Sequence, residues 1–135
     1  ISGGEMSRFM LALKVITGRY GGIDTMIFDE IDTGISGRTG TEVAEKLAGI
    51  SRYSQVFCVT HLAQIASMAD RQYYISKTTD GYTTSTGVKL LDRDGMIDEI
   101  VRLSGAGEGS SNARRAAEEL KERSDEYKRS LGQAG

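Results

Sequence analysis

The sequence predicts an α/β protein, and three observations lead to that class. Two short apolar runs, residues 25–28 and 55–60, have the β-prone composition of buried strands. Residues 5–17 and 38–50 each place apolar side chains at the spacing of an amphipathic helix. Helix and strand patterns therefore alternate along the chain, which is typical of α/β domains.

The first helix is expected over residues 5–17. Ser2-Gly3-Gly4 introduces it and Gly18 closes it. One stripe of this helix is apolar and consists of Met6, Phe9, Met10, Leu13 and Ile16. The pattern predicts an amphipathic helix that begins beside a pair of glycines.

A strand, a loop and a second helix follow. The run over residues 25–28 ends in Asp29-Glu30, which places two carboxylates at the carboxyl end of a buried strand. A glycine-containing loop covers residues 31–37. The helix over residues 38–50 is expected to turn three side chains inward, namely Val43, Leu47 and Ile50.

The second buried strand ends beside the only histidine of the chain. It covers residues 55–60 and is followed by His61 and a short helix over residues 62–68. In open α/β sheets, ligands bind at the carboxyl ends of the strands. We therefore expect Asp29, Glu30 and His61 to lie at the edge where a ligand would bind.

The last third of the chain is more polar. Residues 72–77 and 83–91 predict a β-hairpin that turns at Asp80-Gly81. Residues 96–103 predict a helix, which is broken by the glycines at 105, 107 and 109. Residues 111–131 are rich in Ala, Glu, Lys and Arg and predict a mostly solvated helix.

Composition sets limits on the function. The 135 residues make one domain or part of one, and the formal net charge of −2 gives no overall basic field for nucleic acid.

Cys58 is the only cysteine, so no internal disulfide can form and a reducing cytoplasm is expected. No apolar run approaches the ~20 residues of a membrane span, and no signal peptide pattern is present. Because the chain opens at Ile1, we expect a fragment of a longer protein.

The strand that ends in Asp29-Glu30 matches a Walker B motif. In that motif the aspartate holds Mg²⁺ at the phosphates of a nucleotide, and one carboxylate suffices because magnesium keeps much of its water shell. A glutamate directly after it is placed to act as a general base on a water molecule. A strand whose exit is simply acidic would show the same two residues.

The segment Ser2-Gly3-Gly4-Glu5 is a second candidate for phosphate binding. Free N–H groups and the positive end of a helix favour a phosphate, and glycines allow close approach of the backbone. The same residues also make an ordinary N-cap with an acidic first turn. No Walker A loop, G-x-x-x-x-G-K-[ST], occurs in the sequence, so these residues alone cannot hold a nucleotide in the usual way.

His61 is the third candidate. A single histidine is more often a structural or surface residue than a functional one. Its position at the end of the strand that is expected to neighbour the Walker B strand would let it reach a γ-phosphate.

The order of these signals resembles the ABC ATPase superfamily from its signature motif onward. ISGGE is a mild variant of the family's LSGGE, and Walker B and a strand ending in Thr-His follow it. Within the superfamily the chain resembles the RecN family of SMC-like bacterial repair proteins over nearly its whole length. The segments that carry this resemblance are FDEIDTGISG (28–37), CVTHLAQIA (58–66), ISKT (75–78), EIVRLSG (99–105) and AAEEL (116–120).

The resemblance implies an α/β fold, the carboxy-terminal lobe of an ABC/SMC-type P-loop ATPase head, with a partial sheet and flanking helices. The whole chain, residues 1–135, would hold the signature motif, Walker B, D-loop and histidine switch, without the Walker A lobe and the coiled coil. Asp29 would hold Mg²⁺ through water and Glu30 would activate the hydrolytic water. His61 would contact the γ-phosphate of the ATP bound by the same head.

The signature motif would serve the other head of a dimer. By the same resemblance, Ser2, Gly3 and Gly4 would clamp the γ-phosphate of ATP that a partner head mainly holds. Glu5 would support this loop and the helix start. ATP would then join two heads, and hydrolysis would release them.

The D-loop departs from the family pattern. Transporters usually read DEPTSALD here and SMC heads read close to DEIDAALD, with an aspartate six positions after the glutamate. This chain reads DEIDTGIS, with Asp32, Gly34 and Ser36, so Ser36 takes the place of that aspartate. The departure argues against a transporter. It leaves open whether Ser36 or Asp32 senses the opposite subunit.

The implied ligands are ATP and Mg²⁺. The implied partners are the amino-terminal lobe of the same protein, a second head in a homodimer and DNA in the full-length protein, with no membrane. The intact protein is expected to be a cytoplasmic, nucleoid-associated ATPase in recombinational repair of DNA double-strand breaks. The fragment alone is expected to be inactive and to expose a surface meant for the missing lobe.

Other interpretations use the same residues. In one, ATP-driven closure matters more than hydrolysis, as in a DNA-tethering clamp. A transporter domain and an ordinary α/β domain without these roles are two more. The basic side chains of the last helix could touch DNA phosphates, but interleaved glutamates favour a solvated helix; they are Arg114, Arg115, Lys121, Arg123, Lys128 and Arg129.

Overall fold

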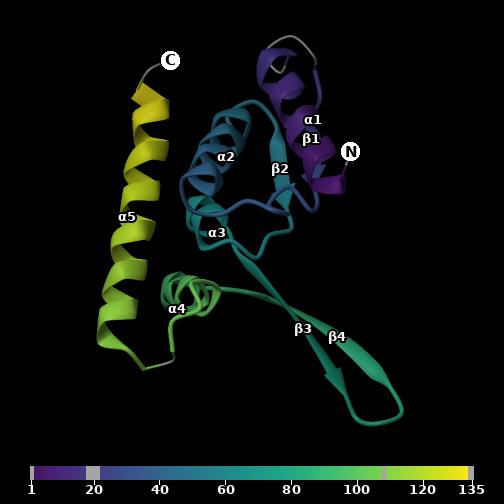
Figure 1. Cartoon of the computed structure of the whole chain (residues 1–135), viewed down its shortest axis with the longest axis vertical. Coiled ribbons are helices and arrows are strands. Elements are labelled where there is room, and N and C mark those ends of the chain that lie inside the picture. Colours follow the sequence, from purple (N-terminus) through teal and green to yellow (C-terminus); the bar gives the residue numbers. More distant parts are fainter. Residues whose placement is uncertain (1, 18–21, 108, 134–135) are drawn as a thin grey trace.

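A computed structural model of the chain describes residues 2–17, 22–107 and 109–133 (Figure 1). Ile1 and Gly18, which were expected to open the signature motif and to close the first helix, lie outside these residues. In chain order the described elements are α1 (Gly3–Thr17), β1 (Thr25–Phe28), α2 (Gly37–Ile50), β2 (Gln55–Cys58), α3 (Ala63–Met68), β3 (Tyr73–Thr79), β4 (Thr84–Leu90), α4 (Arg93–Leu103) and α5 (Ser111–Gln133).

Strands β1 and β2 form a parallel pair, which confirms the α/β class. Phe28 is in register with Cys58, and the N–H of Val59 extends the ladder by donating to the carbonyl of Phe28 at 2.9 Å. The second strand was predicted to run to residue 60 but ends at Cys58. The carboxyl ends of both strands therefore meet at one edge.

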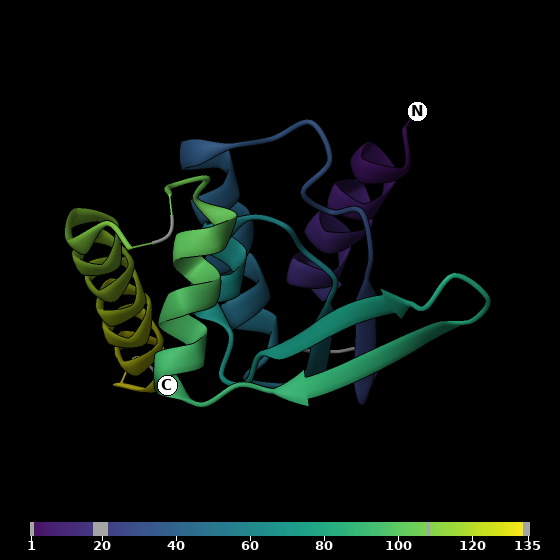
Figure 2. The ribbon, with the colours of Figure 1, turned by 90° about the horizontal axis from the view of Figure 1, so that it is seen from below.

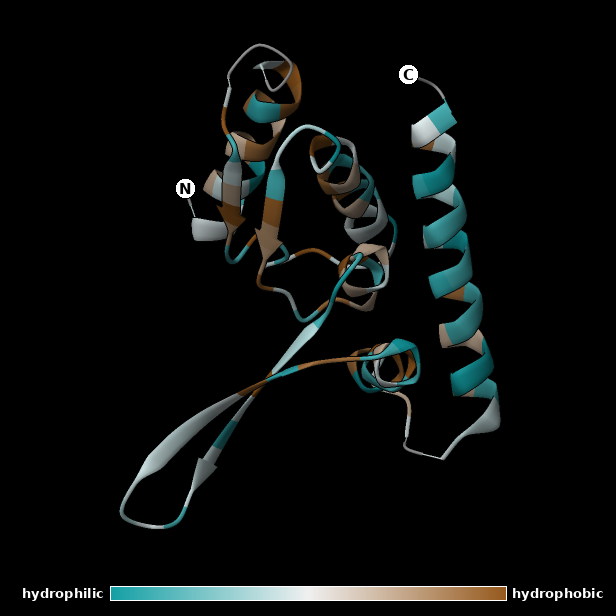
Figure 3. Ribbon diagram, turned by 180° about the vertical axis from the view of Figure 1, so that it is seen from behind, coloured by the Kyte–Doolittle hydropathy of each residue, from teal (hydrophilic) through white to brown (hydrophobic). Residues whose placement is uncertain are grey.

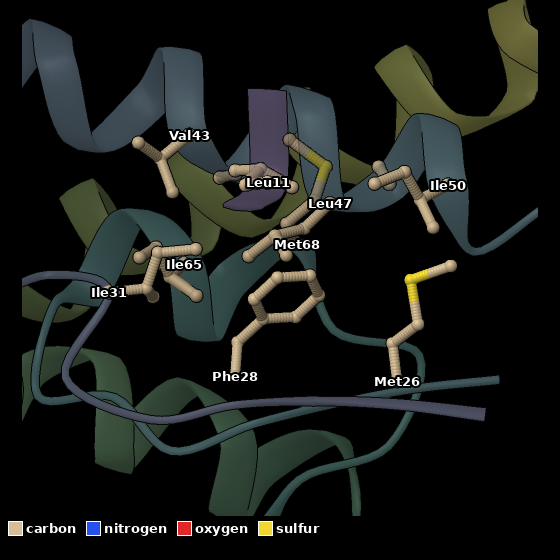
Figure 4. Packing of buried hydrophobic residues seen from close by; sticks show 11 residues of the cluster. Leu11, Met26, Phe28, Ile31, Val43, Leu47, Ile50, Ile65 and Met68 are labelled. Carbon is tan, nitrogen blue, oxygen red and sulfur yellow. The ribbon is translucent and has the colours of Figure 1, made fainter. Parts of the chain in front are cut away.

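The main core lies between one face of this sheet and the helices. Met26 and Phe28 point from β1 toward α2 and α3 (Figure 4). The inward side chains predicted for α2 are buried as expected, and Leu11 of α1 joins the same cluster. The remaining labelled members of the cluster are Ile31, Val43, Leu47, Ile50, Ile65 and Met68.

The opposite face of the sheet is uncovered, which corrects the expectation of fully buried strands. Ile27 is 74% exposed, and Phe57 and Val59 are about half exposed. Parallel strands are normally covered on both faces. Sequence periodicity could not separate one-sided from two-sided burial because every residue in both runs is compatible with either.

The apolar stripe predicted on α1 is also exposed. Phe9 and Ile16 are 60% and 74% exposed, whereas Leu11, outside the predicted stripe, is buried against α2. In Figure 3 the hydrophobic colour marks parts of α1 and of both parallel strands. The stripe exists in the sequence, but no described element packs on it.

Strands β3 and β4 form a separate antiparallel hairpin, as predicted. Tyr73 pairs with Leu90 and Thr79 with Thr84. Both strands are largely exposed, and the hairpin extends away from the helices in Figures 1 and 2. Within the described residues, the predicted partial sheet thus consists of two separate two-stranded sheets.

Helices α4 and α5 pack together and against α3. Helix α4 begins at Arg93, three residues before the predicted start, because the Asp92 carboxylate accepts a hydrogen bond from Gly95 N at 2.8 Å and caps it. Helix α5 was predicted to be mostly solvated, but it buries Ala117, Lys121 and Ser124. Among the described helices, none is both long and apolar enough to cross a bilayer.

Candidate functional site

The exits of β1 and β2 surround an open hollow of about 340 Å³. Asp29 and Glu30 follow β1, and Thr60 and His61 follow β2, so the parallel register brings them to one edge. The complete lining is Asp29, Glu30, Asp32, Thr33, Val59, Thr60 and His61. The predicted carboxylates and histidine are therefore neighbours in the structure.

Asp29 and Glu30 both present exposed carboxylates. Oδ1 of Asp29 accepts a hydrogen bond from Glu30 N at 2.9 Å, while its Oδ2 accepts none from the described residues. Glu30 has a φ of 56°, a left-handed conformation that is uncommon for a residue with a side chain and is enriched at functional sites.

The start of α1 forms a reciprocal capping box. Glu5 N donates to Ser2 Oγ at 3.1 Å, and Ser2 N donates to Glu5 Oε2 at 3.0 Å. Ser2 and Glu5 thus stabilise the first turn. The N–H groups of Gly3 and Gly4 donate no hydrogen bond within the described part of the chain, so Gly3, which is exposed, can offer its N–H to an anion.

The two glycines allow α1 to approach the loop after β1. A methyl group on Gly3 would collide with Oε2 of Glu30, and one on Gly4 would lie 2.8 Å from Cβ of Thr33 and 2.9 Å from the carbonyl oxygen of Glu30. The Glu30 carboxylate is thus at the positive end of α1. The signature residues and Glu30, expected to serve different nucleotides, adjoin each other within one chain.

Two further α1 residues hold this loop and were not identified from the sequence. Ser7 Oγ donates to the carbonyl of Asp29 at 2.9 Å. Arg8 Nη1 donates to the carbonyls of Ile31 and Thr33 at 3.1 and 2.8 Å. Arg8 lies four residues after Gly4 and therefore on the same helix face, a spacing that could have indicated its contact.

Asp32 is a buried anchor between the two strand exits. It is 2% exposed, and its Oδ2 accepts hydrogen bonds from Thr60 Oγ1 at 2.5 Å and His61 N at 2.8 Å. Burial alone raises the pKa of the Asp32 carboxyl, but these hydrogen bonds and the nearby His61 outweigh burial and leave the pKa below its ordinary value. Asp32 is therefore ionised and engaged inside the chain.

Ser36 and Gly34 lie on the surface, unlike Asp32. Ser36 is the N-cap residue of α2, yet its side chain makes no capping hydrogen bond. Gly34 has a φ of 74° at an exposed turn, which a residue with a side chain would adopt only with strain. Of the two candidates for contact with an opposite subunit, Ser36 is the accessible one.

His61 is held on one side and open on the other. Its Nδ1 lies 3.3 Å from Oδ2 of Asp32, while its side chain is 73% exposed.

Cys58, three residues before His61 in the sequence, is half-buried, and burial with the charges of Asp32 and Asp29 raises the pKa of its thiol to about 12. Cys58 is consequently a protonated packing residue and not a nucleophile.

A magnesium ion fits this edge only if other groups complete its shell. The described residues contain no cluster of three or more His, Cys, Asp or Glu side chains placed to hold a metal. The exposed Asp29 offers one free carboxylate oxygen. One carboxylate, water and phosphate oxygens form a usual magnesium shell, so the donor set suits a nucleotide-bound ion.

The basic residues of α5 are mostly engaged in structural contacts. Lys121 is buried, and its Nζ donates to the carbonyls of Ser67 and Ala69 and to Asp125. Arg114 pairs with three carboxylates, those of Asp94, Asp98 and Glu118. These contacts engage Lys121 and Arg114 with other groups of the chain.

Comparison with known proteins finds several similar sequences. The chain is 44% identical over 121 residues to the "DNA repair protein RecN" of Streptomyces coelicolor (strain ATCC BAA-471 / A3(2) / M145). The aligned region covers 90% of this chain and 21% of that protein. It is 43% identical over 127 residues to the protein of the same name from Bacillus subtilis (strain 168), and this alignment covers 94% of the chain and 22% of that protein. The chain thus spans about a fifth of the length of these relatives. No protein-family model matches it.

Proposed function

This chain is RecN-like over nine tenths of its length, and from that premise we propose that it forms the carboxy-terminal lobe of an ABC-type ATPase head in a DNA-repair protein. Its own residues would hydrolyse ATP only with an amino-terminal lobe and a second head. The observation that carries the proposal is the meeting of Asp29, Glu30 and His61 at one hollow. Two parallel strands deliver them there, as expected of a nucleotide site in an α/β sheet.

Each of these side chains has a place in the proposed reaction. Asp29 would hold Mg²⁺, which neutralises charge on the phosphates when it is bound. The Glu30 carboxylate accepts no hydrogen bond from the described residues and is free to accept the proton of an attacking water. His61, which follows the neighbouring strand β2 and lines the same hollow, would contact the terminal phosphate.

The uncovered sheet face supports a missing lobe as the partner. Ile27, Phe57 and Val59 form an exposed apolar face on a parallel pair that normally would be covered. Fully burying side chains of this size contributes about 1.5–3 kcal/mol each. A lobe that covers this face would stabilise the chain, and it would also supply the Walker A loop that the sequence lacks.

The exposed start of α1 supports a second head as a further partner. Gly3 offers an exposed N–H group at the positive end of a helix. Ser36, also exposed, stands where the family's D-loop faces the opposite subunit. ATP bound between two heads would bring both elements into one interface.

The test is ATP turnover after co-expression of this chain with the amino-terminal part of its own protein, with and without linear DNA. Glu30→Gln removes the proton acceptor and keeps the shape of the side chain. We expect it to lower kcat by about 100-fold or more, the range for a lost general base, while nucleotide binding persists.

Glu42→Gln is the matched control because Glu42 is an exposed carboxylate on α2 that, among the residues the structure describes, pairs with Arg38 alone. It should leave turnover unchanged. Full activity of Glu30→Gln, or an equal loss in both variants, would contradict the proposed role of Glu30. If Glu30→Gln instead stays closed on DNA, the clamp interpretation, in which closure matters more than hydrolysis, is favoured.

A further inference from the structure

The environment of His61 contains a feature that the proposed reaction does not use. Oδ2 of Asp32 faces the histidine residue twice, at 2.8 Å from its backbone nitrogen and at 3.3 Å from Nδ1 of its ring. The same oxygen accepts the hydroxyl of Thr60, whose Oγ1 also accepts the N–H of Leu62 at 3.0 Å. One buried carboxylate thus accepts the backbone N–H of the exposed histidine and lies within ion-pair distance of its ring.

Asp32 is itself held from two sides. Arg8 binds the carbonyls of the residues before and after it, Ile31 and Thr33, and Ile35 N donates to the carbonyl of Asp32 at 3.3 Å. At 2% exposure the carboxylate has little contact with water. A buried carboxylate that accepts several hydrogen bonds is held rigidly, because breaking any of these bonds would leave part of its charge unpaired in a poorly solvated environment.

We propose that Asp32 is the positioning residue of His61, holding the imidazole with Nδ1–H toward its own carboxylate and Nε2 toward the hollow. A carboxylate that accepts from one ring nitrogen fixes the tautomer and leaves the other nitrogen for the ligand. The ligand's identity rests on the proposed function, but the orientation of the ring does not.

The test needs no nucleotide. The chain contains one histidine, so the ring-nitrogen signals in a ¹⁵N NMR spectrum belong to His61 without further assignment. The neutral wild-type ring should be in the Nδ1–H tautomer, and Asp32→Asn should move it toward Nε2–H, the form that an unrestrained histidine favours. Thr60→Val is the matched control, because it removes a hydrogen bond to the same Oδ2 without touching the ring, and it should keep Nδ1–H.

Two results would overturn the assignment: an Nε2–H tautomer in the wild type, or an unchanged tautomer in a folded Asp32→Asn variant. If that variant does not fold, the wild type decides alone. A downfield Nδ1 proton protected from exchange supports the contact, and a rapidly exchanging ring contradicts it.

In the co-expressed protein, Asp32→Asn should lower kcat by about tenfold or more with little change in KM, as expected for loss of a group that orients a histidine. Equal loss in Thr60→Val would indicate a merely structural role for Asp32 and contradict the proposal. If the wild type shows no ATP turnover at all, the proposed function fails while the tautomer still tests Asp32.

Discussion

At the scale of single residues, Gly3 and Gly4 at the start of α1 exclude a side chain for different reasons. Beside Gly3 stands the end of the flexible Glu30 side chain, which can move. Beside Gly4 stand the backbone carbonyl of Glu30 and Cβ of Thr33, which cannot move without shifting the loop. Gly4 therefore sets the distance between α1 and the loop that carries Glu30 and Asp32.

Gly4→Ala should destabilise the chain by about 1–3 kcal/mol, because overpacking at this contact forces the backbone apart. Gly49→Ala is the control: Gly49 lies in α2, and a Cβ there meets no atom within 4 Å apart from its chain neighbours and the nearby backbone of its own helix. That change should stabilise the chain by about 0.4–1 kcal/mol by restricting the unfolded state. Urea unfolding of both variants measures the difference, and equal stabilities would rule out the close contact.

Cys58 gives a pH-dependent prediction. Burial, helped by Asp32 and Asp29, raises the pKa of its thiol from 9.0 to about 12 in the folded chain. In the folded state the Cys58 thiol therefore stays protonated to a higher pH than in the unfolded state. The contribution of the protonated thiol to the free energy of unfolding is complete below pH 9.0 and is lost as the pH rises to about 12.

Urea unfolding of the wild type and of Cys58→Ala across that interval tests the assignment. The alkaline loss of stability should be smaller in the variant, which has no thiol to titrate. Parallel pH profiles would show that the Cys58 thiol is not shielded as the structure indicates.

At the scale of elements, α5 shows how a charged helix can be part of a core. Nζ of Lys121 donates to two carbonyls at the carboxyl end of α3 and to Asp125, and Ser67 and Ser124 share a hydrogen bond of 2.8 Å. Desolvation lowers the pKa of Lys121, although Asp125 opposes this effect. The cation also complements the negative end of α3.

Lys121→Met should destabilise the chain by about 3 kcal/mol, since it leaves the buried Ser67 carbonyl without this donor, removes one of two lysine donors to the Ala69 carbonyl and takes one cation from Asp125. Arg123→Ala is the control on the same helix: Arg123 is exposed and has no ion pair among the described residues. It should change stability by less than about 0.5 kcal/mol. Thermal or urea unfolding that finds similar losses in both would contradict the role of Lys121.

At the scale of the whole molecule, the chain carries its core on one side of the parallel strands and apolar surface on the other. The helices cover Met26 and Phe28 (Figure 4). Ile27, Phe57 and the α1 stripe remain exposed. Exposed apolar surface of this kind marks an interface or a tendency to associate. The geometry agrees with a chain that completes its fold with another segment.

The isolated chain is therefore expected to self-associate, and Ile27→Lys with Phe57→Lys should weaken its association constant by at least about tenfold. Each exposed side chain removed from the contact costs about 1.5–3 kcal/mol, and 1.4 kcal/mol corresponds to a factor of ten. Light scattering coupled to gel filtration measures the effect. Val88→Lys, on the exposed hairpin, is the control and should leave association unchanged.

A compact monomer of the wild type that does not depend on salt would contradict this expectation. Co-expression with the amino-terminal part of the protein should give the wild type, but not the double variant, a stable complex. The two measurements separate association through the sheet face from association through the hairpin.

By itself, the sequence determined the α/β class, the positions of most elements, and Asp29, Glu30 and His61 as neighbours at strand ends. These features depend on local periodicity and on the rule that parallel strands end at one edge. The resemblance to RecN was confirmed by relatives at 43–45% identity. The roles proposed for the site residues stay predictions.

Only the tertiary structure decided which apolar faces are covered, because periodicity marks an apolar stripe without showing what packs on it. It placed Leu11 and not Phe9 in the core, and it buried Lys121 in a helix whose composition indicated solvent. It also turned Asp32 inward to His61 and left Ser36 at the surface. Such contacts join residues about thirty or more positions apart, and no local pattern in the sequence encodes them.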